Sequence, residues 1–227
     1  MNDGYRHEYK FLISRSAAEL LRLRLPRIMA RDPHAGPTGT YTIRSLYFDD
    51  LQDTAFFDKV SGVDNRVKYR IRYYNYDPTV LRLEKKEKRG HLTRKTGQRI
   101  TAEEAAALGS RFREDLPERM QGLCEELRLK CASEHLRPKV LVDYDRTAFV
   151  CPLGNTRITL DENLRTRPYC TDLLASSKAM QPVLEPDQVI LEVKFDDFLP
   201  GYLSDALSDI PKASMAISKF ALCMNLT

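Results

Sequence analysis

The sequence lacks the features that would place it in several large classes of protein. Its five cysteines form no CxxC pair and no Cys/His cluster, so neither a disulfide framework nor a zinc site is indicated. No apolar stretch approaches about 18 residues, and the polar residues 1–8 do not resemble a signal peptide. There is no internal repeat and no low-complexity tract. These absences predict a soluble, cytoplasmic protein with no membrane segment.

The overall composition is that of an ordinary globular protein. The chain has 227 residues, of which 42% are hydrophobic and 30% charged, so we expect a single domain spanning residues 1–227. The net charge of +4 is the small difference between 36 basic and 32 acidic residues. Because local fields depend on where each sign is placed, the position of the charges matters more than their sum.

Alternation of apolar and polar residues predicts eight strands. In residues 5–13, for example, Tyr9 and Phe11 alternate with Glu8 and Lys10. The predicted strands cover 5–13, 38–49, 65–76, 80–88, a segment from the turn at Arg89-Gly90 through Lys95 toward Ile100, 137–150, 156–164 and 188–195. Helices are predicted at 14–26, from Thr101 onward, at about 116–134, and at 203–226 with a break near Pro211, while 168–186 has the pattern of a loop. The fold class predicted is α+β with a mostly antiparallel sheet.

Several predicted strands carry charged residues at every second position. Arg66, Lys68, Arg70 and Arg72 share one face of their strand, opposite the apolar face formed by 67, 69, 71 and 73. Similar rows are Arg82, Glu84 and Lys86; Val140, Val142, Tyr144 and Arg146; Arg157, Thr159 and Asp161; and Ile190, Glu192 and Lys194.

These rows allow two interpretations. Charged faces of antiparallel strands usually face bulk water, and the pattern of a single strand favours that arrangement. However, four cations in one row repel each other on an open surface, and amphipathic helices are available to cover the apolar faces. The second interpretation is therefore a sheet closed with its basic faces inward, forming a tunnel that binds a polyanion.

Four acidic residues lie on the same faces as these cations: Glu8, Glu84, Asp161 and Glu192. A few carboxylates among phosphate-binding cations are typical of a Mg²⁺ or Mn²⁺ site that bridges carboxylate and phosphate oxygens. Internal ion pairing would produce the same pattern, and for Glu8 and Glu84 the sequence leaves both explanations open.

Eight short motifs, in order from about residue 5 to 222, resemble the catalytic domain of the vacuolar transporter chaperone (VTC) polyphosphate polymerases, which are triphosphate tunnel metalloenzymes of the CYTH-like superfamily. The motifs are RHEYKF at 6–11, SLYFD at 45–49, KYRIR at 68–72, LEKK at 83–86, YDRTAF at 144–149, RITLD at 157–161, ILEVK at 190–194 and ISKF at 217–220.

The resemblance implies an eight-stranded tunnel barrel with helices packed outside it. It also implies binding of ATP, inorganic polyphosphate, tripolyphosphate or pyrophosphate, together with Mn²⁺ or Mg²⁺. The positions matched to phosphate-binding residues are Lys10, Arg70, Arg72, Lys86, Lys95, Arg146, Arg157 and Lys219, and the metal ligand is Glu192. Lys194, which shares a strand face with Glu192, is predicted as a further phosphate ligand. Of these, Arg70, Arg72, Lys86 and Lys219 are also predicted to act in catalysis.

Two departures from the family pattern bear on function. The wider superfamily often begins with ExExK, whereas this chain has Arg6, Glu8 and Lys10, which argues against a two-metal triphosphatase or an adenylate cyclase. The SPX and membrane-spanning domains of eukaryotic VTC proteins have no counterpart here, so the resemblance implies a stand-alone bacterial version.

The expected activity is transfer of the terminal phosphate of ATP to a growing polyphosphate chain. No Ser/His/Asp or Cys/His set is evident, and phosphoryl transfer needs mainly positioning and charge neutralisation. Hydrolysis of tripolyphosphate or nucleoside triphosphates in the same tunnel, or binding without turnover, remain alternatives. Nucleic-acid binding is less favoured, because Tyr69 and Tyr73 lie on the face opposite Arg70 and Arg72.

Overall fold

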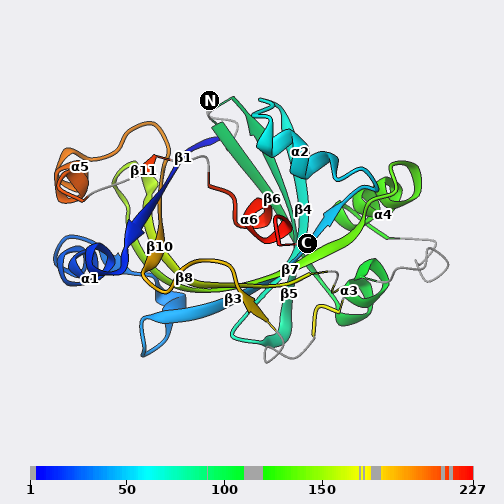
Figure 1. Cartoon of the computed structure of the whole chain (residues 1–227), viewed down its shortest axis with the longest axis horizontal. Coiled ribbons are helices and arrows are strands. Elements are labelled where there is room, and N and C mark those ends of the chain that lie inside the picture. The colour runs from blue at the N-terminus through cyan, green and yellow to red at the C-terminus, as the bar shows by residue number, and fades with distance from the viewer. Residues whose placement is uncertain are drawn as a thin grey trace.

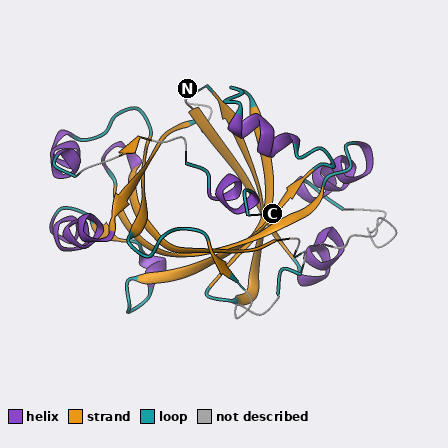
Figure 2. Ribbon diagram, in the orientation of Figure 1, coloured by secondary structure: helices purple, strands orange, loops and turns teal. Residues whose placement is uncertain are grey.

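The computed structural model describes residues 4–90, 92–109, 120–168, 170, 172–174, 180–210, 213–214 and 217–226. Eight long strands dominate it (Figures 1 and 2). They are β1 (Arg6–Ser14), β3 (Thr40–Asp49), β4 (Arg66–Tyr74), β5 (Asp77–Arg89), β6 (Leu92–Ile100), β7 (Arg137–Cys151), β8 (Thr156–Pro168) and β10 (Gln188–Phe195). Each of them overlaps a strand predicted from the sequence.

These strands close into a barrel. The order β7-β3-β4-β5-β6-β1-β10-β8 returns to its start because β8 also pairs with β7, and each of these pairings is antiparallel. The junction between β1 and β6 is the shortest, joining Arg6 to Thr93 and His7 to Leu92. Three two-residue strands extend the sheet: β2 (Ala30–Arg31), β9 (Gln181–Pro182) and β11 (Ala213–Ser214).

Two pairs of helices cover the outside of the barrel on opposite sides (Figure 1). On one side α1 (Arg15–Arg24) and α5 (Gly201–Ser208) bury Leu21 and Leu203 against outward residues of β8 and β10. On the other side α3 (Ala102–Gly109) and α4 (Leu123–Ser133) cover β4 and β5. Tyr69, Ile71 and Tyr73 are buried there, which confirms that the aromatic face of β4 is core beneath helices. Closure with the apolar faces outward therefore leaves the charged faces to line the interior.

Two helices differ from the sequence-based expectation. The helix α2 (Thr54–Val60) was not predicted; it begins after Asp53, which has a φ of 56° and makes no side-chain capping bond, so the usual start signal is missing. The helix α6 (Lys219–Met224) lies within the barrel rather than outside it (Figure 2). Its Phe220 and Cys223 pack against inward-facing Tyr47 and other interior residues, because this short helix is apolar around most of its circumference.

The predicted helix at 116–134 and the break near Pro211 are only partly testable, since 116–119 and 211–212 lie outside the described residues. The same holds for much of the predicted loop at 168–186. Among the described helices, none has the length and apolar character needed to cross a bilayer.

Candidate functional site: a cationic cavity inside the barrel

A cavity of about 510 Å³ occupies the barrel interior and is lined by strands from around the whole ring. Among the described residues, fourteen basic side chains line it, against the two carboxylates of Glu8 and Glu192. The basic residues are Arg6, Lys10, Lys59, Arg66, Lys68, Arg70, Arg72, Lys86, Lys88, Lys95, Arg146, Arg157, Lys194 and Lys219. The ten residues that the sequence predicted for the site are therefore brought together in one enclosed space.

This placement decides between the two interpretations of the charged rows. Arg72 and Arg146 are only 5% and 6% exposed, so the solvent-facing interpretation is wrong for the centre of the tunnel. Strand alternation explains the result, because outward neighbours such as Ile71 and Tyr73 are buried beneath the outer helices. Arg82, at the end of its row, is exposed and does not line the cavity.

Glu84 anchors one group of arginines at the centre. Its Oε2 accepts hydrogen bonds from Arg70 Nε at 2.8 Å and Nη2 at 2.6 Å, and its Oε1 accepts one from Lys95 Nζ at 2.9 Å. Burial alone would raise the pKa of Glu84, but Arg70, Arg72 and Lys95 outweigh it and lower the pKa far below its usual range. The ionised carboxylate thus fixes the orientation of these cations before any ligand arrives.

Tyrosine hydroxyls hold the other ends of the same guanidinium groups. Arg70 Nη1 donates to Tyr47 Oη at 2.7 Å, and Arg72 Nη2 donates to Tyr144 Oη at 2.8 Å. Despite burial, Arg146, Arg72 and Lys219 together lower the pKa of Tyr144. The remaining N–H groups of these planar forks are suited to gripping two oxygens of one phosphate.

A second anchored group surrounds Asp161 on β8. Arg146 donates to both of its oxygens, at 2.6 and 2.7 Å, and Lys219 Nζ lies 2.5 Å from Oδ2. Arg146 Nη2 also reaches Glu192 Oε2 at 3.1 Å. Asp161 is 1% exposed and its pKa is lowered, since Arg146 and Lys219 overcome the penalty of burial. Asp161 therefore acts as an ion-pair partner for two of the predicted phosphate-binding residues.

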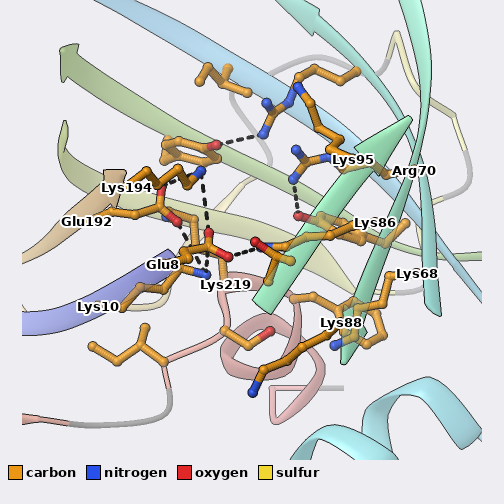
Figure 3. A pocket seen from close by; sticks show the side chains of 18 of the residues that line it. Glu8, Lys10, Lys68, Arg70, Lys86, Lys88, Lys95, Glu192, Lys194 and Lys219 are labelled. Carbon is orange, nitrogen blue, oxygen red and sulfur yellow. Dashed lines mark hydrogen bonds and ion pairs between the residues drawn. The ribbon is translucent and has the colours of Figure 1, made fainter. Parts of the chain in front are cut away.

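Glu8 and Glu192 come from neighbouring strands and sit among three lysines (Figure 3). Lys10 Nζ lies 3.3 Å from an oxygen of each carboxylate, and Lys194 Nζ lies 3.3 Å from Glu8 and 3.2 Å from Glu192. Lys86 pairs with the other oxygen of Glu8. Burial would raise the pKa of Glu8, but Lys10, Lys86 and Lys194 lower it to about 2. The four carboxylates Glu8, Glu84, Asp161 and Glu192, with the cations paired to them, are called the carboxylate group below.

The donors around Glu8 and Glu192 fit a divalent cation. Glu8 Oε1 is buried and has no hydrogen bond partner of good geometry among the described residues, and Glu192 projects into the same space from the next strand. Mg²⁺ and Mn²⁺ bind one or two carboxylates and complete their coordination with phosphate oxygens and water. No group of three or more acidic, His or Cys side chains that could hold an ion occurs in the described part of the chain. A metal here would consequently depend on phosphate oxygens for most of its ligands.

The remaining predicted residues occupy the periphery. Arg157 pairs with Asp32 and donates a hydrogen bond to Tyr41 Oη at 2.8 Å, and its side chain is one-third exposed. Lys95 is half exposed. Lys86 lies among Lys10 and Lys194 as well as Glu8 with its side chain about one-third exposed, and partial burial is the chief cause that lowers its pKa to about 7.

Sequence reasoning left five cavity-lining cations unassigned: Arg6, Lys59, Arg66, Lys68 and Lys88. Arg6 stands in the first motif, two positions before Glu8 on the same face of β1. Arg66 and Lys68 belong to the row noticed in the sequence, and alternation from Lys86 along the same strand would also have placed Lys88 inward. Lys59 had no such signal, because it lies on α2, the helix that was not predicted.

One solved structure supports this architecture, and two others are similar to a lesser degree. The chain is 16% identical to a candidate adenylate cyclase from Bacillus halodurans, with a TM-score of 0.55 over 93% of this chain and 95% of that one, a likeness that supports the fold. A candidate adenylate cyclase from Vibrio parahaemolyticus has 10% identity and a TM-score of 0.44 over 88% and 82% of the two chains. The Mimivirus capping enzyme triphosphatase has 12% identity and a TM-score of 0.43 over 91% and 88%.

A search of curated proteins finds no match to the sequence. The family comparison gives a different result, because the model of the VTC domain matches residues 5–227. That match spans the whole closed barrel and α6 as well as every residue that lines the cavity except Gly4. The chain belongs to the VTC domain family.

Proposed function

We propose that this protein is a metal-dependent polyphosphate polymerase, which transfers the terminal phosphate of ATP to a growing polyphosphate chain within the barrel. The observation that carries the proposal is the excess of fourteen cations over two carboxylates on the wall of one enclosed cavity. Because low-dielectric walls focus such a field, the cavity is suited to a highly charged linear anion.

The size of the charge excess favours a polymer over a single triphosphate. Four carboxylates behind the wall, Asp32, Glu84, Asp161 and Asp196, also pair with these cations. Even with all four counted, the cations exceed the carboxylates by eight. A phosphate chain carries roughly one negative charge per phosphate, so one triphosphate neutralises only part of this excess. A donor triphosphate and an acceptor chain bound together balance it better.

The residues of the cavity have distinct tasks in this reaction. Arg70, Arg72 and Arg146, each pre-oriented by a carboxylate or a tyrosine, grip and align the donor phosphates. Lys86, Lys194 and Lys219 add point charges along the chain. Glu192 and Glu8 would hold a divalent ion, which would supply further neutralisation of the phosphate charge.

The transfer itself is balanced without a protein nucleophile. A terminal oxygen of the acceptor chain attacks the γ-phosphorus, the bond between that phosphorus and the β–γ bridging oxygen breaks, and a nucleoside diphosphate leaves with the electron pair. The attacking oxygen is already anionic near neutral pH, so no general base is required. This is consistent with a cavity wall that contains no histidine among the described residues.

The proposal is tested by incubating the protein with ATP and Mn²⁺ and measuring polymer on a gel and orthophosphate separately. We expect a long-chain product. Orthophosphate without polymer would identify a hydrolase instead, and tight binding without either product would identify a binding domain.

Two variants connect this activity to the site. The double variant Arg70→Ala/Arg72→Ala should abolish tripolyphosphate binding in calorimetry while far-UV circular dichroism stays unchanged. Glu192→Gln should lose metal-dependent turnover and retain part of the binding. Arg82→Ala is the matched control, because Arg82 pairs with Arg72 across the strands but is exposed and outside the cavity. Normal tripolyphosphate binding by the double variant would refute the assignment of the site.

A further inference from the structure

One part of the cavity wall has cations but no carboxylates. It consists of Lys59 on α2, Arg66 and Lys68 on β4, and Lys88 on β5, which we call the lysine cluster. Figure 3 shows Lys68 and Lys88 on the side toward α2, away from the pair formed by Glu8 and Glu192. The two parts of the wall therefore differ in chemistry as well as position.

The register of β4 and β5 places like charges directly opposite each other. Arg66 is paired with Lys88, and Lys68 is paired with Lys86, whereas the next inward pair joins Arg70 to Glu84. Like charges at directly opposite positions destabilise a sheet. In these two successive inward pairs only Lys86 has a carboxylate partner, Glu8, which indicates a segment whose charges are balanced by a bound anion.

Within the lysine cluster, Lys68 is the residue most affected by this repulsion. Its Nζ is buried, has no hydrogen bond partner among the described residues and lies 4.3 Å from the centre of the Phe220 ring. Burial is the main cause that lowers its pKa to about 7, and Arg66, Lys10 and Lys59 add to the shift. An ammonium group in this setting gains far more from an anionic ligand than one already paired with a carboxylate.

The nearby acidic residues are committed to other contacts. Asp49, which faces Lys68, accepts backbone N–H bonds from Asp50, Ala55 and Phe56 at 2.9–3.0 Å and so holds the start of α2. Asp58 and Asp64 act on Arg66, whose Nη1 also donates to the carbonyl oxygens of Asp58 and Val63. None of these carboxylates lines the cavity.

The chemistry of the lysine cluster suits an extended phosphate chain better than a metal–triphosphate complex. It offers no carboxylate for a metal, whereas the metal-binding candidates Glu8 and Glu192 belong to the other part of the wall. Lysine ammonium groups are point charges on flexible stems, which can follow a chain in many registers, while the anchored arginines favour one fixed geometry. The nearest ring, Phe220, is 2% exposed, so it gives no open platform for stacking a base.

We propose that the lysine cluster is an acceptor subsite, which binds internal phosphates of the polyphosphate chain while its end meets the donor phosphate beside Glu8 and Glu192. This inference rests on the proposed function and adds to it a division of the cavity into donor and acceptor parts. Lys10 and Lys86 stand at the boundary, since each contacts Glu8 and both lie within the field of the lysine cluster.

The test uses the double variant Lys59→Gln/Lys88→Gln, because both side chains are only half-buried and their removal leaves no carboxylate unpaired. Calorimetry measures binding of long-chain inorganic polyphosphate and, separately, of tripolyphosphate with Mn²⁺. We expect polyphosphate affinity to fall about tenfold or more, since two phosphate contacts are lost, and tripolyphosphate affinity to change less than about twofold. The matched control is Arg27→Gln/Arg82→Gln, which removes the same charge from exposed positions outside the cavity.

The outcomes separate this proposal from the one on which it rests. Unchanged polyphosphate affinity, or an equal loss for both probes, would overturn the acceptor subsite. Tighter binding of a single-stranded oligonucleotide than of polyphosphate would overturn the assigned ligand. If the wild-type protein bound neither phosphate probe, the proposed function itself would be wrong. In the polymer assay, the double variant should make shorter chains from ATP with little change in the KM for ATP.

Discussion

The carboxylate group and the lysine cluster line the same cavity but balance their charges in opposite ways. In the carboxylate group, Arg146 donates two short hydrogen bonds to Asp161, and Glu84 accepts hydrogen bonds from Arg70 and Lys95. In the lysine cluster, Lys68 has a ring beneath it and cations around it. The first arrangement is preorganised in the folded protein, while the second is completed only by a ligand.

This difference explains how one tunnel could combine a fixed reaction site with a movable chain. Preorganised charges stabilise a transition state because they need no rearrangement when it forms. A polymer that advances by one phosphate per cycle, in contrast, must exchange contacts many times, which favours flexible lysines. Variants in the carboxylate group and in the lysine cluster should therefore differ in their effects on stability and on its dependence on pH.

Among the single variants, the largest effect on stability is expected from Arg146→Ala. The variant leaves Asp161 buried with only Lys219 as a partner and removes a neighbour from Glu192. Breaking a buried ion pair by removing one partner destabilises a protein by about 3–5 kcal/mol. Denaturant unfolding monitored by circular dichroism measures the loss. The control from the other half is Lys88→Ala, which should be neutral or stabilising; an equal loss from both would remove the distinction between the halves.

A smaller effect is expected from Glu8→Gln, and it depends on pH. The folded-state pKa of Glu8 is about 2, below its ordinary value of 4.5, because Lys10, Lys86 and Lys194 outweigh burial. The charge of Glu8 therefore stabilises the fold above about pH 4.5, and this contribution of about 2–3 kcal/mol is lost as the pH falls toward 2.

In Glu8→Gln the free energy of unfolding should consequently be lower near neutral pH and should depend less on pH between about 4.5 and 2. Thermal unfolding of both proteins at a series of pH values measures the difference. Parallel profiles for the two proteins would show that Glu8 is not the group held ionised by the lysines.

The fold was largely predictable because its signal is local. In β4 and β10 the alternation of charge with apolar residues fixes which side chains share a face, and the burial of Ile71 and Leu191 follows the prediction. Which direction the charged face points cannot be derived from one strand, since it depends on closure of the ring through β7 and β8 and on the outer helices. The motifs along the whole chain were needed to favour the tunnel.

The ion pairs inside the tunnel could not be predicted from the sequence to the same extent. Asp161 was noticed as a possible metal ligand, but its contacts with Arg146 and Lys219 join β8, β7 and α6, and they depend on strand register and on α6 entering the barrel. Lys59 was missed for a related reason, because it reaches the cavity only through the position of α2. Contacts between distant segments are set by tertiary packing rather than by any local pattern.

The smallest effect on stability is expected from Lys68→Met in the lysine cluster, and its dependence on pH is opposite to that of Glu8→Gln. Lys68→Met removes a buried ammonium whose pKa is lowered to about 7 by burial, Arg66, Lys10 and Lys59, with Asp49 opposing them. Below pH 7 Lys68 is charged in both the folded and the unfolded protein, and the fold bears the full penalty of the buried charge. Between pH 7 and about 10.5 the folded protein sheds this proton more readily than the unfolded chain, so the penalty fades. The variant should therefore be more stable than the wild type by about 1–2 kcal/mol at pH 6, after allowance for screening, and about equally stable near pH 10.

Polyphosphate should cancel that advantage, because a bound anion stabilises the charged Lys68 and raises its pKa. With saturating polyphosphate at pH 6, the wild type should gain more in thermal stability than Lys68→Met, and its extra gain should shrink as the pH rises through 7. A gain in thermal stability of equal size in both proteins at every pH would show that the polyphosphate chain does not contact Lys68. The lysine cluster would then differ from the carboxylate group in the free protein but would have no part in binding the chain.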